Sequence, residues 1–240
     1  MEKLISEQKS IIPACDVATS AKLRNIIVAT ASVYGIGAYK VGLRLGLRGL
    51  KRAVEIIRDY TPVPIIYDHQ KGGTDIPDLG TDFAQDLKSF GVDAAILFPF
   101  GGAATERKWI KSCQDVGLIV LVGGHMTQPE FLESEGGFIA DSAPERIYTI
   151  AVENGVTNFV VPGNKVEFVV KYRQLLEKLL GKGNFTLYAP GFIKQGGNIS
   201  ETGEAAGENW HAIVGGALYN QKGVINIRNA AMELTSQIAG

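Results

Sequence analysis

Three charged residues follow one apolar stretch of the chain at close spacing. The apolar run 63–67 ends at Asp68. Lys71 comes three residues later and Asp75 four residues after that. The β-branched and aromatic residues of the run are typical of a buried strand, and the Gly72–Gly73 pair is typical of a loop. An ammonium between two carboxylates therefore stands where a strand ends, which is the edge that carries chemistry in α/β folds.

Two more charged residues stand in earlier apolar segments or at their ends. Ile11–Asp16 is an apolar run that ends in an acid, and the short segment Gly37–Val41 carries Lys40. If these segments are neighbouring parallel strands, Asp16, Lys40 and Asp68 converge at one edge, where opposite charges keep each other ionised. The alternative is a structural ion-pair network without chemistry, or separate charges on solvated loops.

Two glycine-containing segments late in the chain suit an anion. Gly196 and Gly197 follow one apolar segment, and Gly215 and Gly216 follow the next. Glycines let backbone N–H groups approach an anion closely, and a following helix N-terminus adds a favourable dipole. If these are the loops after strands seven and eight of a barrel, they are where such folds often bind phosphate. Simple turns without a ligand are the alternative.

Strand-like and helical segments alternate along the whole chain. Strands are predicted at 11–16, 37–41, 63–67, 93–98, 118–122, 158–161, 185–189 and 211–214, and helices at 21–34, 50–60, 78–90, 105–116, 144–154, 166–180 and within 224–238. This alternation predicts parallel strands, and eight units in 240 residues is the size of a (β/α)8 TIM barrel. No linker interrupts the pattern, so we expect a single domain over residues 1–240, with a leading helix over residues 1–10. An open doubly wound sheet is the alternative.

The composition limits the class of protein. The formal net charge is -1, which does not point to nucleic acid or to an anionic membrane surface. The apolar runs are too short to cross a bilayer, and residues 1–10 lack the apolar centre of a signal peptide, so we expect a cytoplasmic protein. Cys15 and Cys113 match no metal or disulfide spacing, and His125 has no second ligand nearby, so no metal site is expected.

Together these residues resemble the orotidine 5′-monophosphate decarboxylase family, whose members are (β/α)8 barrels, and the resemblance covers most of the chain. The family has an acid after strand one and a lysine on strand two, which Asp16 and Lys40 match. After strand three it has an Asp-x-Lys-x-x-Asp-Ile-Pro-like signature. Asp68, Lys71 and Asp75 match its order and chemistry, with one extra residue in each interval.

The resemblance continues in the second half of the chain. The turn Met126–Pro129 is similar to the family's Met-Ser-His-Pro-like turn, with Thr127 supplying the hydroxyl that meets the pyrimidine. The family's Pro-Gly…Gln-Gly-Gly loop over the phosphate is matched by Pro190, Gly191, Gln195, Gly196 and Gly197. The motif after strand eight usually reads Val-Gly-Arg, but here Gly216 stands in place of the arginine. Lys194, which follows strand seven, could replace it.

The resemblance implies decarboxylation of orotidine 5′-monophosphate to uridine 5′-monophosphate without a metal or an organic cofactor. In that reaction Lys71 would protonate the carbanion left at C6 of the pyrimidine, and Asp68 would lie near the departing carboxylate. Lys40 would orient Asp68 and the ribose hydroxyls, and Asp16 would bind the ribose. The acid matching Asp75 reaches the neighbouring subunit's site in this family, which implies a homodimer with shared active sites.

Two other functions stay open from the sequence. The same barrel group contains decarboxylases and aldolases that act on sugar phosphates, for which the acids after strand three would bind Mg²⁺. The altered spacing and the missing arginine are also compatible with an inactive barrel that binds a nucleotide or another metabolite without turnover.

Overall fold

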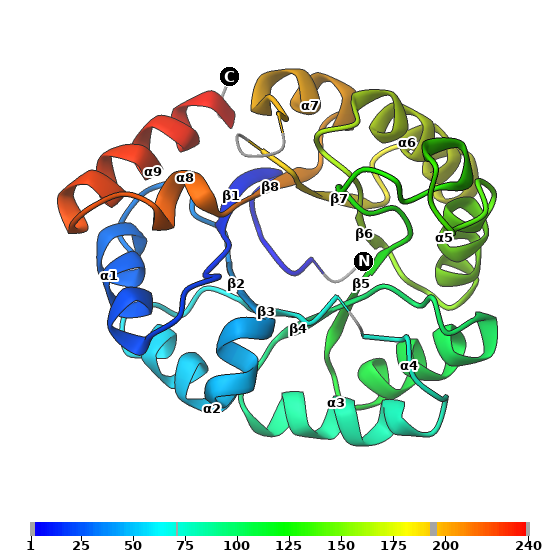
Figure 1. Cartoon of the computed structure of the whole chain (residues 1–240), viewed down its shortest axis with the longest axis horizontal. Coiled ribbons are helices and arrows are strands. Elements are labelled where there is room, and N and C mark those ends of the chain that lie inside the picture. Colours follow the sequence, from blue (N-terminus) through cyan, green and yellow to red (C-terminus); the bar gives the residue numbers. More distant parts are fainter. Residues whose placement is uncertain (1–2, 71, 193–195, 239–240) are drawn as a thin grey trace.

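A ring of eight parallel strands forms the centre of the computed structural model, which describes residues 3–70, 72–192 and 196–238 (Figure 1). The strands are β1 (Lys9–Pro13), β2 (Tyr39–Gly42), β3 (Ile65–Asp68), β4 (Ala94–Leu97), β5 (Ile119–Gly123), β6 (Asn158–Val160), β7 (Thr186–Pro190) and β8 (Trp210–Val214). Hydrogen bonds join them in the order β1-β8-β7-β6-β5-β4-β3-β2. Isolated bridges pair Ile11 with Ile36 and Ala14 with Lys40 between β1 and β2. The sheet closes on itself, so the prediction of a (β/α)8 barrel is confirmed.

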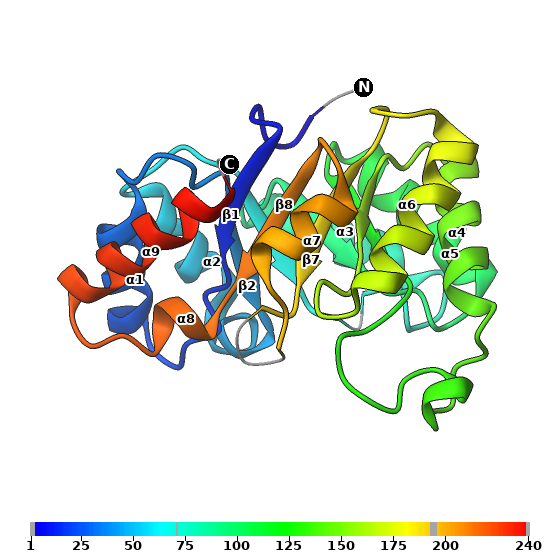
Figure 2. The ribbon, with the colours of Figure 1, turned by 90° about the horizontal axis from the view of Figure 1, so that it is seen from above.

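Helices follow the strands and cover the outside of the ring (Figures 1 and 2). They are α1 (Ser20–Thr30), α2 (Leu43–Arg58), α3 (Leu79–Ser89), α4 (Ala103–Asp115), α5 (Ala143–Glu153), α6 (Val166–Leu180), α7 (Ile199–Ala206), α8 (Gly216–Tyr219) and α9 (Val224–Ile238), with a short 3-10 helix η1 (Glu133–Glu135) before α5. Helix α2 begins earlier than predicted and is kinked at Gly49, whose φ of 119° a glycine adopts without strain. Helices α7 and α8 were not predicted. No helix in the described ranges is long and apolar enough to span a membrane.

Apolar side chains fill two layers, one inside the ring and one between the ring and its helices. Successive side chains of a strand point to opposite faces of the sheet. In β1, Ile12 belongs to the inner cluster and Ile11 to the outer one, and in β3 the same holds for Ile66 and Ile65. Both faces of the sheet are therefore buried, which explains why the strands are continuous apolar runs in the sequence.

Residues 3–8 do not form the leading helix that the sequence predicts. They form a series of bends, and β1 begins at Lys9. Leu4 and Ile5 are buried in the inner cluster, and the segment lies across the ring in Figure 1. The carbonyl of Gln8 also accepts a hydrogen bond from the backbone of Trp210 at 2.9 Å, which draws the segment into the sheet. Burial of this apolar pair over the open end of the barrel outweighs local helix formation.

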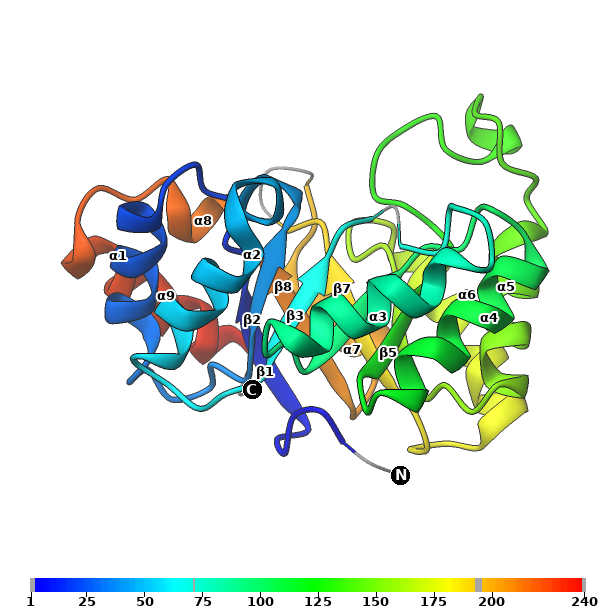
Figure 3. The same cartoon turned by 90° about the horizontal axis from the view of Figure 1, so that it is seen from below.

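The two ends of the barrel differ. The amino-terminal segment closes the end at which the strands begin, whereas the long connection from β5 to α5, which contains η1, projects from the end at which they finish (Figure 3). In barrels of this kind the loops at the finishing end build the active site.

Candidate active site

Charged side chains from three neighbouring strands meet where those strands finish. The Nζ of Lys40 lies 2.8 Å from Oδ2 of Asp68 and 3.4 Å from Oδ2 of Asp16. Lys40 and Asp68 are buried, whereas the side chain of Asp16 is partly open to solvent. The three residues that the sequence predicts to converge therefore do so.

Strand pairing and one glycine bring these side chains together. In the register of β2 and β3, Gly42 lies opposite Asp68, so Lys40 and Asp68 stand near the same edge. The backbone N–H of Cys15 donates to the carbonyl of Lys40 at 2.8 Å, which places the end of β1 beside β2. A Cβ added to Gly42 would lie 2.4 Å from Oδ1 of Asp16, so a side chain there would displace this carboxylate.

Lys40 remains charged although it is buried. Burial by itself favours the neutral amine, but the carboxylates of Asp68 and Asp16 together outweigh it and raise the pKa of Lys40 above its usual value. The neighbouring thiol of Cys15 has a raised pKa because of burial and the negative charge of Asp16. The cluster therefore presents two carboxylates and one ammonium, with no reactive thiolate beside them.

Lys71 lies outside the described residues, and Asp75 lies in the loop after β3, apart from the charged cluster. The loop is attached to α4, because Thr105 Oγ1 donates to the carbonyl of Asp75 at 2.8 Å and the indole N–H of Trp109 donates to that of Ile76 at 3.0 Å. The Asp75 side chain is exposed and accepts a hydrogen bond from the backbone of Ile76 at 2.7 Å. Within the described part of the chain it forms no ion pair.

The turn after β5 contacts the turns after β6 and β7. Thr127 is half-buried there, and its carbonyl accepts a hydrogen bond from Nδ2 of Asn164 at 3.0 Å. A Cβ on Gly191 would lie 2.9 Å from Oδ1 of Asn164 and 3.1 Å from Cγ2 of Thr127. Gly191 also has a φ of 112°, so both its space and its backbone conformation require glycine. The turns after β5, β6 and β7 thus pack closely around Thr127, the residue that is predicted to contact the pyrimidine.

A second polar cluster, which the sequence analysis did not predict, lies beside this turn. His125 is buried, with Nδ1 2.8 Å from the hydroxyl of Tyr172 and Nε2 2.9 Å from Nζ of Lys165. Lys165 also contacts Oε1 of Glu135 at 2.5 Å. Burial, aided by the positive charge of Lys165, lowers the pKa of His125 to about 4, so the ring is neutral at neutral pH. Lys165 is separated from Glu135 by 30 residues and from His125 by 40, so only the fold reveals the cluster.

The turns after β7 and β8 lie side by side because the two strands pair, with Pro190 opposite Ile213. Lys194 and Gln195 fall outside the described residues. The predicted phosphate-binding residues of these turns that the structure does describe are Pro190, Gly196, Gly197, Gly215 and Gly216. Glycine-containing backbone from neighbouring strands is a suitable surface for an anionic group. Among the described residues no group of three or more potential ligands could hold a metal ion.

The chain is similar to curated decarboxylases over most of its length, although no family model matches it. An orotidine 5′-phosphate decarboxylase of Methanosarcina mazei is 30% identical over 207 residues, which cover 85% of this chain and 84% of that protein. The chain belongs to the orotidine 5′-phosphate decarboxylase family. A second relative of the same name, from Methanosphaera stadtmanae, is 25% identical over 234 residues, or 96% of this chain and 98% of that protein.

Solved structures with this fold include other members of the family. Orotidine 5′-phosphate decarboxylase from Pyrococcus horikoshii has a TM-score of 0.77 with 25% identity, covering 96% of this chain and 99% of that one. The orotidine 5′-monophosphate decarboxylase from Methanocaldococcus jannaschii, solved with the inhibitor BMP, has a TM-score of 0.82 with 20% identity, covering 97% and 99% of the two chains. At that identity the second likeness supports the fold alone.

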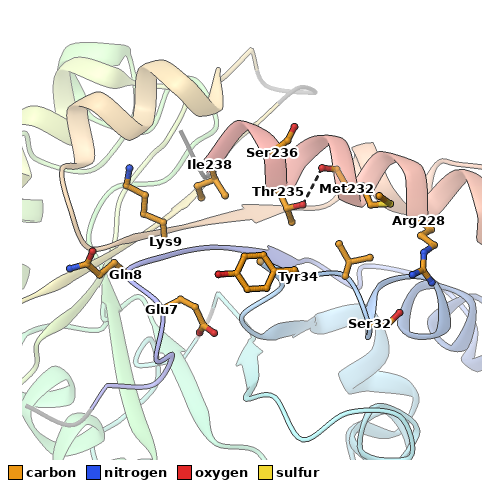
Figure 4. A pocket seen from close by; sticks show the side chains of 12 residues that line it. Glu7, Gln8, Lys9, Ser32, Tyr34, Arg228, Met232, Thr235, Ser236 and Ile238 are labelled. Carbon is orange, nitrogen blue, oxygen red and sulfur yellow. Dashed lines mark hydrogen bonds between the residues drawn. The ribbon is translucent and has the colours of Figure 1, made fainter.

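A cavity of about 760 Å³ lies at the opposite end of this decarboxylase-family barrel (Figure 4). It is lined by the residues that begin β1, by the segment after α1 and by α9, including Lys9, Tyr34 and Met232. None of the described site residues predicted from the sequence lines it. Although this cavity is large, it is not the candidate active site. The candidate active site lies at the other end of the barrel, where Asp16, Lys40 and Asp68 meet.

Proposed function

We propose that this chain is an orotidine 5′-monophosphate decarboxylase, a carboxy-lyase that produces uridine 5′-monophosphate in pyrimidine biosynthesis. The observation that carries the proposal is the cluster of Asp16, Lys40 and Asp68 at adjacent strand ends, in a chain that belongs to this family. The proposal includes a small nucleotide as substrate, a cytoplasmic location, and a reaction that uses no metal or organic cofactor.

We assign the proton donor of the reaction to Lys71. When the bond between C6 and the carboxylate breaks, carbon dioxide leaves and the electron pair stays on C6. The ammonium of Lys71 stabilises that charge and then transfers a proton to C6. Asp68 supplies the negative charge beside the departing carboxylate. Support comes from the 2.8 Å contact with Lys40, which holds the Asp68 side chain at the end of β3.

The same proposal assigns the remaining described residues to substrate binding. Asp16 is the most exposed member of the charged cluster and binds the ribose, while Lys40 orients Asp68 and the ribose hydroxyls. Thr127 meets the pyrimidine from the turn after β5. This role is supported by the half-buried position of Thr127 and by the hydrogen bond that its carbonyl accepts from Asn164.

Glycine-containing backbone after β7 and β8 binds the phosphate in this proposal. The residues assigned to it are Pro190, Gln195, Gly196, Gly197, Gly215 and Gly216. Because Gly216 stands where the family usually has an arginine, we assign Lys194 as the compensating cation. A dianion held by backbone N–H groups gains further from one nearby positive charge.

We also propose a homodimer in which Asp75 completes the partner's active site. Asp75 is exposed, and Ile76 beside it is an exposed apolar residue. An exposed acid next to exposed apolar surface suits an interface between two copies related by a two-fold axis, in which each contributes the same residue to the other.

The deciding experiment measures release of carbon dioxide from orotidine 5′-monophosphate by the purified chain, with and without a chelator. We expect turnover that the chelator does not change. Turnover lost on chelation and restored by Mg²⁺ would favour the metal-dependent sugar-phosphate alternative. Binding of uridine 5′-monophosphate without any turnover would instead identify an inactive nucleotide-binding barrel.

A further inference from the structure

The long connection between β5 and α5 carries Thr127 but has little regular structure of its own. Residues 126–142 contain only the short helix η1 and an isolated bridge between Leu132 and Ile139. The connection projects beyond the strand ends in Figure 3. A segment of this kind needs contacts from outside itself to hold one side chain at a binding site.

His125, Glu135 and Lys165, which we call the anchor cluster, supply such contacts. Lys165 stands at the start of α6 on the barrel body, and Glu135 stands within the projecting connection. One carboxylate oxygen of Glu135 contacts Lys165 at 2.5 Å. The other accepts the backbone N–H groups of Phe131 and Leu132 at 3.3 and 3.2 Å. A single carboxylate thus ties the fold of the connection to the barrel.

The hydrogen-bonding groups of the anchor cluster fix its protonation pattern. A lysine ammonium only donates, so the Nε2 of His125, 2.9 Å from Lys165, must be the unprotonated acceptor. The proton of the neutral ring is therefore on Nδ1, which donates to the hydroxyl of Tyr172 at 2.8 Å. The Nζ of Lys165 thus lies between an imidazole acceptor and a carboxylate, and each of these polar atoms has a partner.

The anchor cluster is shielded from water, unlike an ordinary surface ion pair. The side chains of Lys165 and Glu135 are 12% and 20% exposed. In the pair formed by Lys111 and Asp115 on α4, the corresponding values are 71% and 58%. Exposed pairs contribute little to stability, whereas a shielded pair with further hydrogen bonds holds its geometry more strongly.

We propose that Lys165 and Glu135 are positioning residues for the pyrimidine-binding turn, acting on Thr127 through the fold of the connection and through His125. Asn164, which precedes Lys165, holds the carbonyl of Thr127 directly at 3.0 Å. The turn after β6 therefore holds the connection at its first residues through Asn164 and at η1 through Lys165. Neither Lys165 nor Glu135 takes part in the chemical step. The inference rests on the proposed function only in naming the pyrimidine as the group that Thr127 meets.

The test compares Lys165→Met, which keeps most of the side chain's length but removes its charge, with Lys165→Arg, which keeps the charge. Lys111→Met is the matched control, because it removes an exposed ion pair. Amide hydrogen exchange over residues 126–142 is measured without ligand, and affinity for uridine 5′-monophosphate is measured by calorimetry.

We expect Lys165→Met to speed exchange over 126–142 and to weaken uridine 5′-monophosphate binding by about ten- to a hundredfold, the size expected when a binding group is misplaced from a distance. Lys165→Arg should keep the exchange rate and the affinity close to those of the unaltered chain. Lys111→Met should change neither the exchange rate nor the affinity. Unchanged exchange in Lys165→Met overturns the inference, as does faster exchange with unchanged affinity. Failure of the unaltered chain to release carbon dioxide would contradict the proposed function instead, and the exchange comparison would still decide whether Lys165 anchors the connection.

Discussion

Replacing Lys40 by methionine tests whether the charged cluster is a buried ion pair rather than a set of solvated charges. Methionine has a similar length and no charge, so the substitution leaves the carboxylate of Asp68 buried without its cation. Asp16 loses a more distant partner, at 3.4 Å. We expect a large loss of stability together with loss of decarboxylation.

The magnitude follows from the burial of the two partners. The side chains of Lys40 and Asp68 are 8% and 7% exposed, and their charged atoms are 2.8 Å apart. Removing one partner of a buried pair costs about 3–5 kcal/mol, because the other charge is left without solvation. Asp16, with a side chain 40% exposed, adds at most about 1 kcal/mol. The free energy of unfolding should therefore fall by about 3–5 kcal/mol, mostly because of Asp68.

The pH dependence has a definite sign. Since the pKa of Lys40 is raised on folding, its stabilising contribution is complete below the unfolded-state value of about 10.4 and is lost only as the pH rises through the higher folded-state value. Lys40 therefore adds no pH dependence to the unaltered chain between about pH 5 and 8.

Urea unfolding followed by tryptophan fluorescence measures the free energy of unfolding of Lys40→Met, since Trp109 and Trp210 are both buried. Adding Asp68→Asn to Lys40→Met removes the unpaired charge and should recover a large part of the lost stability. The reasoning is refuted if Lys40→Met costs less than about 1 kcal/mol, the range of exposed pairs, or if the double variant is no more stable than the single one.

Four further outcomes are expected. Lys71→Ala should abolish decarboxylation while leaving nucleotide binding and folding largely intact, because a methyl group cannot deliver a proton; near-normal turnover would contradict the assignment. Mixing inactive Asp75→Asn with inactive Lys71→Ala should restore some activity through mixed dimers, and no recovery after proven subunit exchange would exclude shared sites. Lys194→Ala should raise the KM for the nucleotide by about ten- to over a hundredfold, with part recovered by Gly216→Arg in the same background; unchanged binding of uridine 5′-monophosphate would refute the compensation. Ile5→Ala should lower the free energy of unfolding by about 2–5 kcal/mol in urea, since Ile5 fills the inner layer at the closed end, and a change near zero would show that this end is dispensable.

The barrel and the charged cluster were predictable because both depend on strands. Strands buried on both faces are continuous apolar runs, and the charged residues stand where the runs stop. Asp16 and Asp68 mark such stops and Lys40 lies within β2, and the pairing of parallel strands is then enough to bring them together. The small errors concern the bounds of elements: β1 begins at Lys9 and α2 begins before the kink at Gly49.

Features that depend on irregular segments were not predictable. Leu4 and Ile5 have no periodic pattern around them, so the sequence does not show that they close the barrel end. The anchor cluster depends on Glu135, which lies in a connection without a long element, and on contacts across 30 and 40 residues. The partners of a buried histidine such as His125 can be identified only from the fold, because no sequence spacing predicts contacts between distant residues.

The charge balance of the site gives a reason why Lys40 would matter to the proposed reaction, in which Lys71 and not Lys40 is assigned the proton transfer. Asp16 and Asp68 contribute -1 each and Lys40 contributes +1, so the described cluster has a formal charge of -1. In the proposed reaction Lys71 would bring the sum to zero, and the bound substrate would then add its carboxylate. Loss of carbon dioxide leaves the total charge unchanged and moves the negative charge onto C6, so only a fixed arrangement of charges can favour the transition state over the bound substrate. If Asp68 could turn freely to pair with the ammonium of Lys71, that ammonium would be neutralised before the charge reached C6. The 2.8 Å pair with Lys40 holds the Asp68 carboxylate. Under the proposed mechanism this pair would leave the ammonium of Lys71 for the carbanion.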